Sequence, residues 1–129
     1  MIRVAIADDH RELRTALRLL LNLAPNLEIV FEATSGREAV ADVQQFLPDV
    51  LVMDVRMPDL DGLAAARQMR DLALSTRIIL ISMYKETAIV RAAAAAGVHG
   101  FIYKGDLIPS LTEAIVVVHE GGRYFPDGL

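Results

Sequence analysis

Five short runs dominated by aliphatic residues recur along the chain, and a stretch with helical spacing follows each of them. The runs are Ile2–Ala7, Leu27–Ala33, Val50–Met53, Arg77–Ser82 and Gly100–Lys104. Apolar runs of this length are typical of strands buried on both faces of a parallel sheet. Helices between such strands form right-handed crossovers, which place all the strands in one sheet. The pattern therefore predicts an α/β fold, a flavodoxin-like (βα)5 doubly wound parallel sheet with strand order 2-1-3-4-5.

The segments between these runs carry apolar residues at spacings of three and four, which indicates helices with one buried face. Ser35 and Asp61 stand where they can cap the second and third helices, and Gly97 where it can end the fourth. The residues that we expect to face inward are Leu13, Ala16, Leu17, Leu20, Leu21 and Ala24 in the first helix, Ala39, Val40, Val43, Phe46 and Leu47 in the second, Leu63, Ala66, Met69 and Leu72 in the third, and Leu111, Ala114, Ile115 and Val118 in the last.

The composition restricts both the core and the function. Of the 129 residues, 53% are hydrophobic but only 5% are aromatic, so the core must be aliphatic. A net charge of −4 argues against non-specific nucleic-acid binding by this chain. The absence of cysteine excludes disulfides, thiolate zinc sites and a cysteine nucleophile. Because the sequence shows neither a long apolar run nor a signal-peptide pattern, we expect a soluble, cytoplasmic protein.

Four of the five predicted strands end in polar residues. Asp8-Asp9 follow the first strand, Asp54 follows the third, Ser82 ends the fourth and Lys104 the fifth. The carboxyl ends of parallel strands meet at one edge of the sheet, so we expect these side chains to converge there. Three crowded carboxylates repel one another, and burying them without partners costs several kcal/mol. A Mg²⁺ ion, which prefers oxygen ligands, would remove that cost.

These groups suit the transfer of a phosphoryl group to a carboxylate. Mg²⁺, the Lys104 ammonium and the Ser82 hydroxyl can each stabilise one equatorial oxygen of the transferred group. Asp54, at the centre, would be the nucleophile that forms an acyl phosphate. The sequence contains no phosphate loop of the GxxxxGK type, so the phosphoryl group must come from another molecule.

The whole chain resembles the receiver domains of two-component response regulators. The resemblance rests on Asp8-Asp9, on the run DVRMPDLDG (Asp54–Gly62), on Ser82 after an aliphatic strand and on Lys104 after GFIY. Each feature is weak by itself. All four in this order, at the ends of these strands, are a specific pattern.

The resemblance implies a phosphoacceptor and a metal site. Asp54 matches the residue that a sensor histidine kinase phosphorylates. Asp9 and Asp54 match direct ligands of Mg²⁺, Asp8 a ligand through water, and Arg56 a ligand through its backbone carbonyl oxygen. His10 follows the acid pair, which places it either near the metal or in the first turn of a helix facing solvent, and we expect the second.

The resemblance also implies a conformational switch. Lys104 and Ser82 match the residues that bind the phosphoryl group, and Phe101 matches an aromatic residue that swings inward when the hydroxyl engages the phosphate. Such a domain is a signalling phosphoacceptor and not an enzyme in the ordinary sense, although it assists its own phosphorylation and dephosphorylation.

Within this family, SMYKE after the fourth strand and GGRYFP near the end resemble receivers of the NarL/LuxR type. Those carry a C-terminal helix-turn-helix domain that binds DNA and regulates transcription, and the sequence has no room for one. We therefore expect part of a longer regulator, in preference to a receiver that acts alone through protein contacts. We place the receiver domain at 1–121 and the start of a linker at 122–129.

Three positions depart from the common receiver pattern. One is the switch aromatic Phe101, which lacks a hydroxyl that could form a hydrogen bond across the output face. Gly105 follows Lys104 where many receivers have proline, which leaves the state of that peptide bond open. Met83 is bulkier than the small residue common beside the hydroxyl. Our hypothesis is that Met83, Arg56 and Tyr84 shield the acyl phosphate from water and prolong its lifetime.

Apolar residues away from the inward stripes suggest a homodimer. Val116 and Val117 on the last helix and Leu19 on the first are such residues. The surfaces they favour lie between the first and fifth helices, or between the fifth strand and the fifth helix.

Other functions on the same fold require different residues. A phosphatase of the haloacid-dehalogenase kind needs an acid two positions after its nucleophile, where this chain has Arg56. A flavodoxin-like cofactor binder needs a loop rich in Ser, Thr and Gly after the first strand, where Asp8-Asp9 would repel a phosphate in the absence of a metal. A pseudo-receiver that acts by binding alone would not need the full set of acids.

Overall fold

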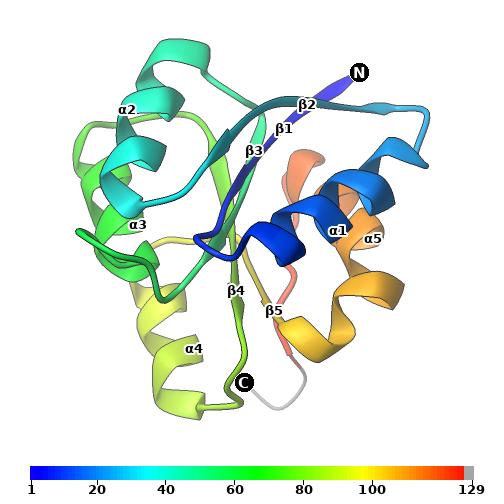
Figure 1. Ribbon diagram of the computed structural model, residues 1–129. Helices are drawn as coiled ribbons and strands as arrows, with labels where there is room; N and C mark the ends of the chain where they lie inside the picture. Colours follow the sequence, from blue (N-terminus) through cyan, green and yellow to red (C-terminus); the bar gives the residue numbers. More distant parts are fainter. Residues whose placement is uncertain (127–129) are drawn as a thin grey trace.

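A computed structural model describes residues 1–126, which form a single parallel sheet with helices on both faces (Figure 1). The strands are β1 (Ile2–Ala7), β2 (Leu27–Ala33), β3 (Val50–Asp54), β4 (Arg77–Ser82) and β5 (Gly100–Tyr103). Their order is β2-β1-β3-β4-β5 and every neighbouring pair is parallel, which confirms the prediction. β5 ends one residue earlier than predicted, because Lys104 begins a short 3-10 turn, η1 (Lys104–Asp106).

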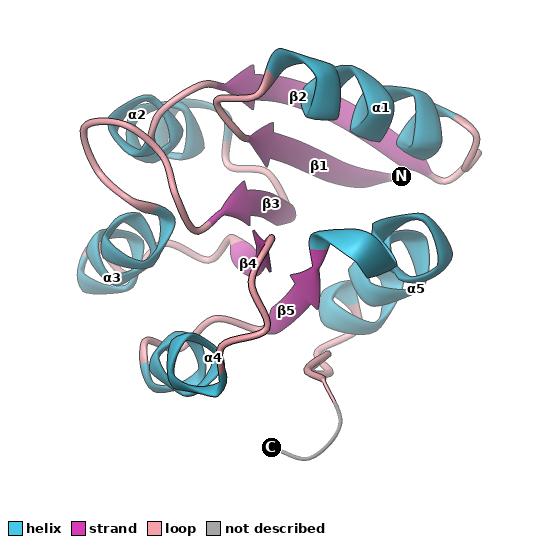
Figure 2. Ribbon diagram, turned by 60° about the horizontal axis from the view of Figure 1, so that its bottom comes forward, coloured by secondary structure: helices cyan, strands magenta, loops and turns pink. Residues whose placement is uncertain are grey.

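Helices cover both faces of the sheet (Figure 2). α1 (Arg11–Asn22) and α5 (Leu107–His119) lie on the first face, and α2 (Gly36–Phe46), α3 (Gly62–Asp71) and α4 (Thr87–Ala95) lie on the second. Because successive strand residues point to opposite faces, β3 contributes to both apolar layers. Val50 and Val52 pack with α1 and α5, whereas Leu51 and Met53 pack on the side of α2, α3 and α4.

The predicted helix signals are confirmed. Ser35 Oγ accepts a hydrogen bond from the Glu38 N–H at 3.2 Å, and the Glu38 carboxylate accepts one from the Thr34 N–H at 3.0 Å. Asp61 Oδ1 accepts one from the Ala64 N–H at 2.8 Å. Gly97 follows the last residue of the α4 cap with a φ of +88°, a conformation that favours glycine.

Four residues that we expected to face inward are exposed. Phe46, Leu47 and Leu72 lie at or just beyond the C-terminal ends of α2 and α3, and Ala16 lies in the middle of α1. The helical phase no longer applies at Leu47, which has a left-handed φ of 46°. For Phe46, Leu47 and Leu72, burial was overestimated because the apolar spacing was extended to or past the end of the helix.

The segment after α5 returns to the sheet and lies along the free edge of β5. Tyr124 forms a parallel bridge with Gly100, donates its N–H to the His99 oxygen at 2.9 Å and accepts the Phe101 N–H at 2.8 Å. Phe125 packs against the apolar layer that contains α4. These contacts satisfy edge groups of β5 that would otherwise be unpaired. A linker that begins at 122 stays a prediction, and 127–129 lie outside the described residues.

The surfaces suggested for a homodimer are less apolar than the sequence indicates. Val116 and Val117 are half-buried, and the Gly122 N–H donates to the Val117 oxygen at 2.9 Å. Leu19 is exposed as expected, and Ile108 on α5, which we did not single out, is 80% exposed.

Within the described part of the chain, each helix is too short or too polar to cross a bilayer.

Candidate functional site

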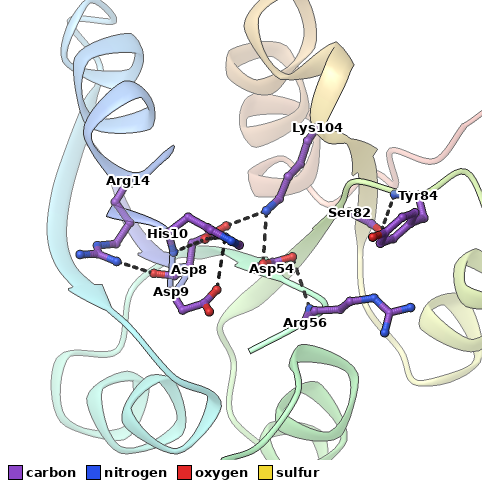
Figure 3. Close-up of polar contacts among 9 residues, drawn as sticks. All are labelled: Asp8, Asp9, His10, Arg14, Asp54, Arg56, Ser82, Tyr84 and Lys104. Carbon is purple, nitrogen blue, oxygen red and sulfur yellow. Dashed lines mark hydrogen bonds and ion pairs between the residues drawn. The ribbon is translucent and has the colours of Figure 1, made fainter. Parts of the chain in front are cut away.

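The carboxyl ends of β1 and β3 bring two buried acids to a lysine that follows β5 (Figure 3). Asp8 and Asp54 are buried, and Lys104 Nζ lies 3.1 Å from Asp8 Oδ2 and 3.2 Å from Asp54 Oδ2. The predicted convergence is therefore confirmed for Asp8, Asp54 and Lys104, whereas Ser82 Oγ is bonded to the Tyr84 N–H. The convergence arises because β1 and β3 are adjacent in the sheet, and the long lysine side chain reaches across from β5.

The loop after β3 folds back onto the strand and fixes the Asp54 carboxylate. The Gly62 N–H donates to the Val55 oxygen at 2.7 Å, and the Arg56 N–H donates to Asp54 Oδ1 at 3.3 Å. Only glycine fits at position 62, since a Cβ there would lie 2.1 Å from the Asp54 carbonyl oxygen. The run DVRMPDLDG thus forms a short loop whose two ends touch.

Asp8 is held through both its backbone and its side chain. Its Oδ1 accepts the His10 N–H at 2.8 Å and lies 3.1 Å from His10 Nδ1. Its backbone oxygen accepts a hydrogen bond from the Arg14 guanidinium at 2.8 Å. Its Oδ2 accepts no hydrogen bond in the described structure and has only the charged contact to Lys104.

The electrostatics leave the site short of positive charge. Burial, reinforced by the Asp8 charge, raises the pKa of Asp54 above its usual value, although Lys104 and the Arg56 N–H oppose the shift. A single ammonium group between two buried carboxylates cannot neutralise both of them. A cation is therefore the natural further partner of this pair.

The donor set fits a hard divalent cation. One oxygen each from Asp8, Asp9 and Asp54 and a ring nitrogen of His10 all lie within 4.8 Å of one another. Carboxylate oxygens are the ligands that Mg²⁺ prefers, and the buried Oδ2 of Asp8, which accepts no hydrogen bond and has only the charged contact to Lys104, agrees with a further cation nearby. That the backbone carbonyl oxygen of Arg56 is a further ligand of the metal stays a prediction.

His10 is exposed to solvent, as expected, with 64% of its side chain accessible. Its Nδ1 nevertheless lies 3.1 Å from Asp8 Oδ1 and 3.3 Å from Asp9 Oδ1, so the ring is also next to the acid pair (Figure 3). The signal in the sequence was its position directly after the acid pair. What the sequence does not show is the side-chain rotamer.

The two switch candidates, Ser82 and Phe101, are both buried. Ser82 Oγ accepts the Tyr84 N–H at 3.1 Å, and Figure 3 shows its side chain beside Tyr84. Phe101 is 1% exposed and meets the Tyr103 ring edge-on at a centroid distance of 5.8 Å. In this structure the Phe101 side chain therefore points inward, the position that the resemblance assigns to the switch aromatic.

Two of the three candidate shielding residues meet each other. The Arg56 guanidinium lies 5.3 Å from the centre of the Tyr84 ring and 4.0 Å from Glu86, whereas Met83 is exposed beside them.

The described chain contains no cis peptide bond, so the Lys104–Gly105 bond is trans. This is the expected preference when the following residue is not proline.

Comparison with known proteins identifies the class that this fold and site define. Residues 4–116 match the family model of the response regulator receiver domain, and the chain belongs to that family. It is similar to the transcriptional regulatory protein DesR of Bacillus subtilis (strain 168), with 37% identity over 128 residues that cover 98% of this chain and 63% of DesR. It is also similar to the probable transcriptional regulatory protein NarL of Mycobacterium tuberculosis (strain CDC 1551 / Oshkosh), with 35% identity over 120 residues that cover 93% of this chain and 56% of that protein.

Solved structures agree with this family. The signal receiver domain of the putative response regulator NarL from Mycobacterium tuberculosis has a TM-score of 0.90 at 35% identity, covering 93% of this chain and 97% of that one. A LuxR-family two-component response regulator from Aurantimonas sp. SI85-9A1 also has a TM-score of 0.90, at 30% identity, covering 95% of this chain and 87% of that one. The predicted NarL/LuxR-type resemblance is confirmed. The chain spans between half and two thirds of the length of the curated relatives it matches.

Proposed function

We propose that this chain accepts a phosphoryl group from a sensor histidine kinase onto Asp54 and changes conformation to control an output. The supporting observation is the Lys104 ammonium between the buried carboxylates of Asp8 and Asp54. A structural ion pair needs one acid. Here a second acid contacts the same ammonium and a third acid, Asp9, lies close by. Such an excess of carboxylates suits a site that binds a metal cation and receives a negatively charged phosphoryl group.

The chain's own residues account for the transfer step. A carboxylate oxygen of Asp54 attacks the phosphorus of a phosphohistidine, the new P–O bond forms, and the P–N bond breaks so that the imidazole leaves. The Lys104 ammonium, 3.2 Å from Asp54 Oδ2, is placed to hold one oxygen of the transferred group. Mg²⁺ held by Asp9 and Asp54, with Asp8 through water and the Arg56 carbonyl oxygen, would supply the remaining positive charge.

The Ser82 hydroxyl can couple this chemistry to the fold. It now accepts the Tyr84 N–H, so turning toward a phosphoryl oxygen at Asp54 would break that bond and release the start of the β4–α4 loop. Phosphorylation can shift the conformation only as far as the two conformations bind the phosphoryl group differently. A shift from 1:99 to 99:1 requires about 5.5 kcal/mol of differential binding.

The relatives support transcription as the output. DesR and NarL are named transcriptional regulatory proteins, and a LuxR-family structure from Staphylococcus aureus is described as a DNA-binding response regulator. We propose that this receiver likewise acts on DNA through an effector domain and not directly, as its net charge of −4 agrees with indirect action. A receiver that acts alone is the second candidate. We also propose cytoplasmic location, where kinase and DNA are both accessible.

A homodimer through α1 and α5 is a further part of this proposal. Leu19 on α1 and Ile108 on α5 are large apolar residues that are exposed. Leu19→Glu should abolish any association that phosphorylation induces, as measured by sedimentation velocity. Sedimentation that is unchanged by Leu19→Glu would contradict this surface.

Intact mass spectrometry after incubation with acetyl phosphate and Mg²⁺ tests the central claim. The wild type should gain one phosphoryl group, and Asp54→Asn should gain none. Asp59→Asn is a matched control, because Asp59 is an exposed acid of the same loop. A phosphoryl gain that survives in Asp54→Asn, or no gain in the wild type, would refute the proposal.

Arg56, Met83 and Tyr84 provide the proposed control of phosphate lifetime. The Arg56–Tyr84 stack narrows the approach of water, and Met83 stands beside Ser82 at the same rim. Met83→Ala and Arg56→Ala should both shorten the lifetime of the phosphorylated chain, followed by the decay of the added mass in EDTA. If neither variant changes the decay rate, these side chains do not shield the bond.

A further inference from the structure

The ring of His10 stands at the distance from the acid pair that two ligands of one metal ion would have. His10 Nδ1 lies 3.1 Å from Asp8 Oδ1 and 3.3 Å from Asp9 Oδ1. Neighbouring ligands of an octahedral ion with bonds of about 2.1 Å are about 3.0 Å apart. His10 Nδ1 and Asp9 Oδ1, which is a direct ligand in the proposed site, therefore already have nearly the spacing of adjacent ligands.

The backbone holds this ring in place. His10 is the N-cap of α1 with an extended backbone, and its N–H donates to Asp8 Oδ1 at 2.8 Å. The guanidinium of Arg14, one helical turn further on, donates to the backbone oxygen of Asp8 at 2.8 Å. The two bonds tie the start of α1 to the acid pair, so the imidazole needs no movement of the main chain to reach an ion. Because the side chain is 64% exposed, an ion can approach it from solvent.

Two roles for the ring agree with these contacts, and they make opposite predictions for metal binding. As a hydrogen-bond donor, Nδ1 would hold the carboxylates and compete with every cation for them. As a ligand, Nδ1 would add nitrogen to a set of oxygens. Imidazole suits Zn²⁺, Ni²⁺ and Cu²⁺, whereas carboxylate, carbonyl and water suit Mg²⁺ and Mn²⁺. The selectivity of the site therefore distinguishes the two roles.

Two observations favour the ligand role over a donor role. Asp8 already receives the His10 backbone N–H and the charge of Lys104, so it does not need a further donor to remain in place. In addition, Nδ1 lies nearly equally far from oxygens of two different carboxylates. A position between two acids is a position where a shared cation, and not a single hydrogen bond, satisfies all three groups.

We propose that His10 is a direct ligand of the divalent-cation site, and that this site consequently binds transition-metal ions such as Ni²⁺ and Zn²⁺ much more tightly than an all-oxygen receiver site would. The inference rests on the metal site of the proposed function, to which it adds a ligand and a selectivity.

Calorimetric titration of the untagged protein with Ni²⁺ and, separately, with Mg²⁺ tests this inference. His10→Gln keeps a polar side chain but removes the imidazole, and it should weaken Ni²⁺ binding by about tenfold or more, as losses at metal sites commonly do. Its Mg²⁺ affinity should change less than about threefold, because the oxygen ligands remain. His119→Gln is the matched control, since His119 is an exposed histidine at the far end of α5.

Each outcome separates the inference from the proposed function. Equal losses for both ions, no loss for either ion, or a tenfold loss in His119→Gln would overturn the role of His10. Resonances of the imidazole nitrogens provide a second readout, because Zn²⁺ should shift those of His10 and leave those of His119 in place. If the wild type takes up no phosphoryl group, the proposed function fails whatever the Ni²⁺ titration shows.

Discussion

Gly62 lies against the backbone of Asp54, and alanine at this position tests how strictly the site depends on that contact. A Cβ on Gly62 would lie 2.1 Å from the Asp54 carbonyl oxygen and 3.0 Å from its carbonyl carbon. Both are main-chain atoms, so a rotamer change cannot relieve the overlap. The Gly62 N–H also donates to the Val55 oxygen at 2.7 Å, which leaves the loop little freedom to retreat.

The size of the expected effect follows from that distance. The new carbon would be about 1.3 Å inside the 3.4 Å at which ordinary contact begins, so the end of β3 and the start of α3 must separate. Overpacking costs typically about 1–3 kcal/mol, and a clash between two main-chain segments belongs at the upper end of that range. With a urea m-value of about 1–3 kcal/mol/M, a loss of about 3 kcal/mol lowers the midpoint by about 1–3 M.

Urea unfolding followed by far-UV circular dichroism measures this loss of stability. Gly105→Ala is the matched control, because a Cβ there meets no atom within 4 Å and its φ is not left-handed. Alanine at position 105 should change stability little or raise it by about 0.4–1 kcal/mol. If Gly62→Ala and Gly105→Ala unfold at the same urea concentration, the close approach of Gly62 to Asp54 does not constrain the fold and the reasoning is refuted.

Three further predictions follow from burial and charge. Because burial raises the pKa of Asp54, its ionisation destabilises the folded state. In thermal melts at pH 7, Asp54→Asn should therefore be more stable than the wild type. This difference in stability should shrink as the pH falls through the folded-state pKa of Asp54, because the wild-type carboxylate then becomes protonated. Phe125→Ala should cost about 1–2 kcal/mol, less than the 3–5 kcal/mol of a fully buried phenylalanine, and should speed hydrogen exchange at the Phe101 N–H. Glu32→Gln should cost less than about 1 kcal/mol despite the 2.6 Å contact with Arg18, and its cost should vanish in 1 M salt.

The sheet could be predicted because its signal is local. Each buried strand is a run of apolar residues, and each run ends where Asp, Ser, Lys or a turn residue begins. Three strands have the predicted bounds, and the order follows from the pattern of crossovers. The meeting of Asp8, Asp54 and Lys104 was predictable for the same reason, since the positions of parallel strand ends determine which side chains can approach each other.

The attachment of the C-terminal segment could not be predicted in this way. Gly121-Gly122 and Pro126 gave this segment the composition of a linker. Its partner is the main chain of β5, and a free strand edge has no sequence signature because its donors and acceptors are common to nearly all residues. The sequence left the place of the His10 ring undecided for a related reason: the rotamer at the end of a strand depends on contacts that no spacing rule describes.

The receiver resemblance links an inward position of Phe101 to a Ser82 hydroxyl that engages the phosphate, and this structure shows the first position without the second. Phe101 is buried while Ser82 remains bound to the Tyr84 N–H, so burial of the aromatic ring does not require the hydroxyl to leave its loop. A phosphoryl group can shift the equilibrium between two conformations only if it binds them differently. We therefore propose that the difference between the two states arises at Ser82 and in the loop that follows it. A change there can reach the edge of β5, where the Phe101 N–H donates to the Tyr124 oxygen and holds the C-terminal segment.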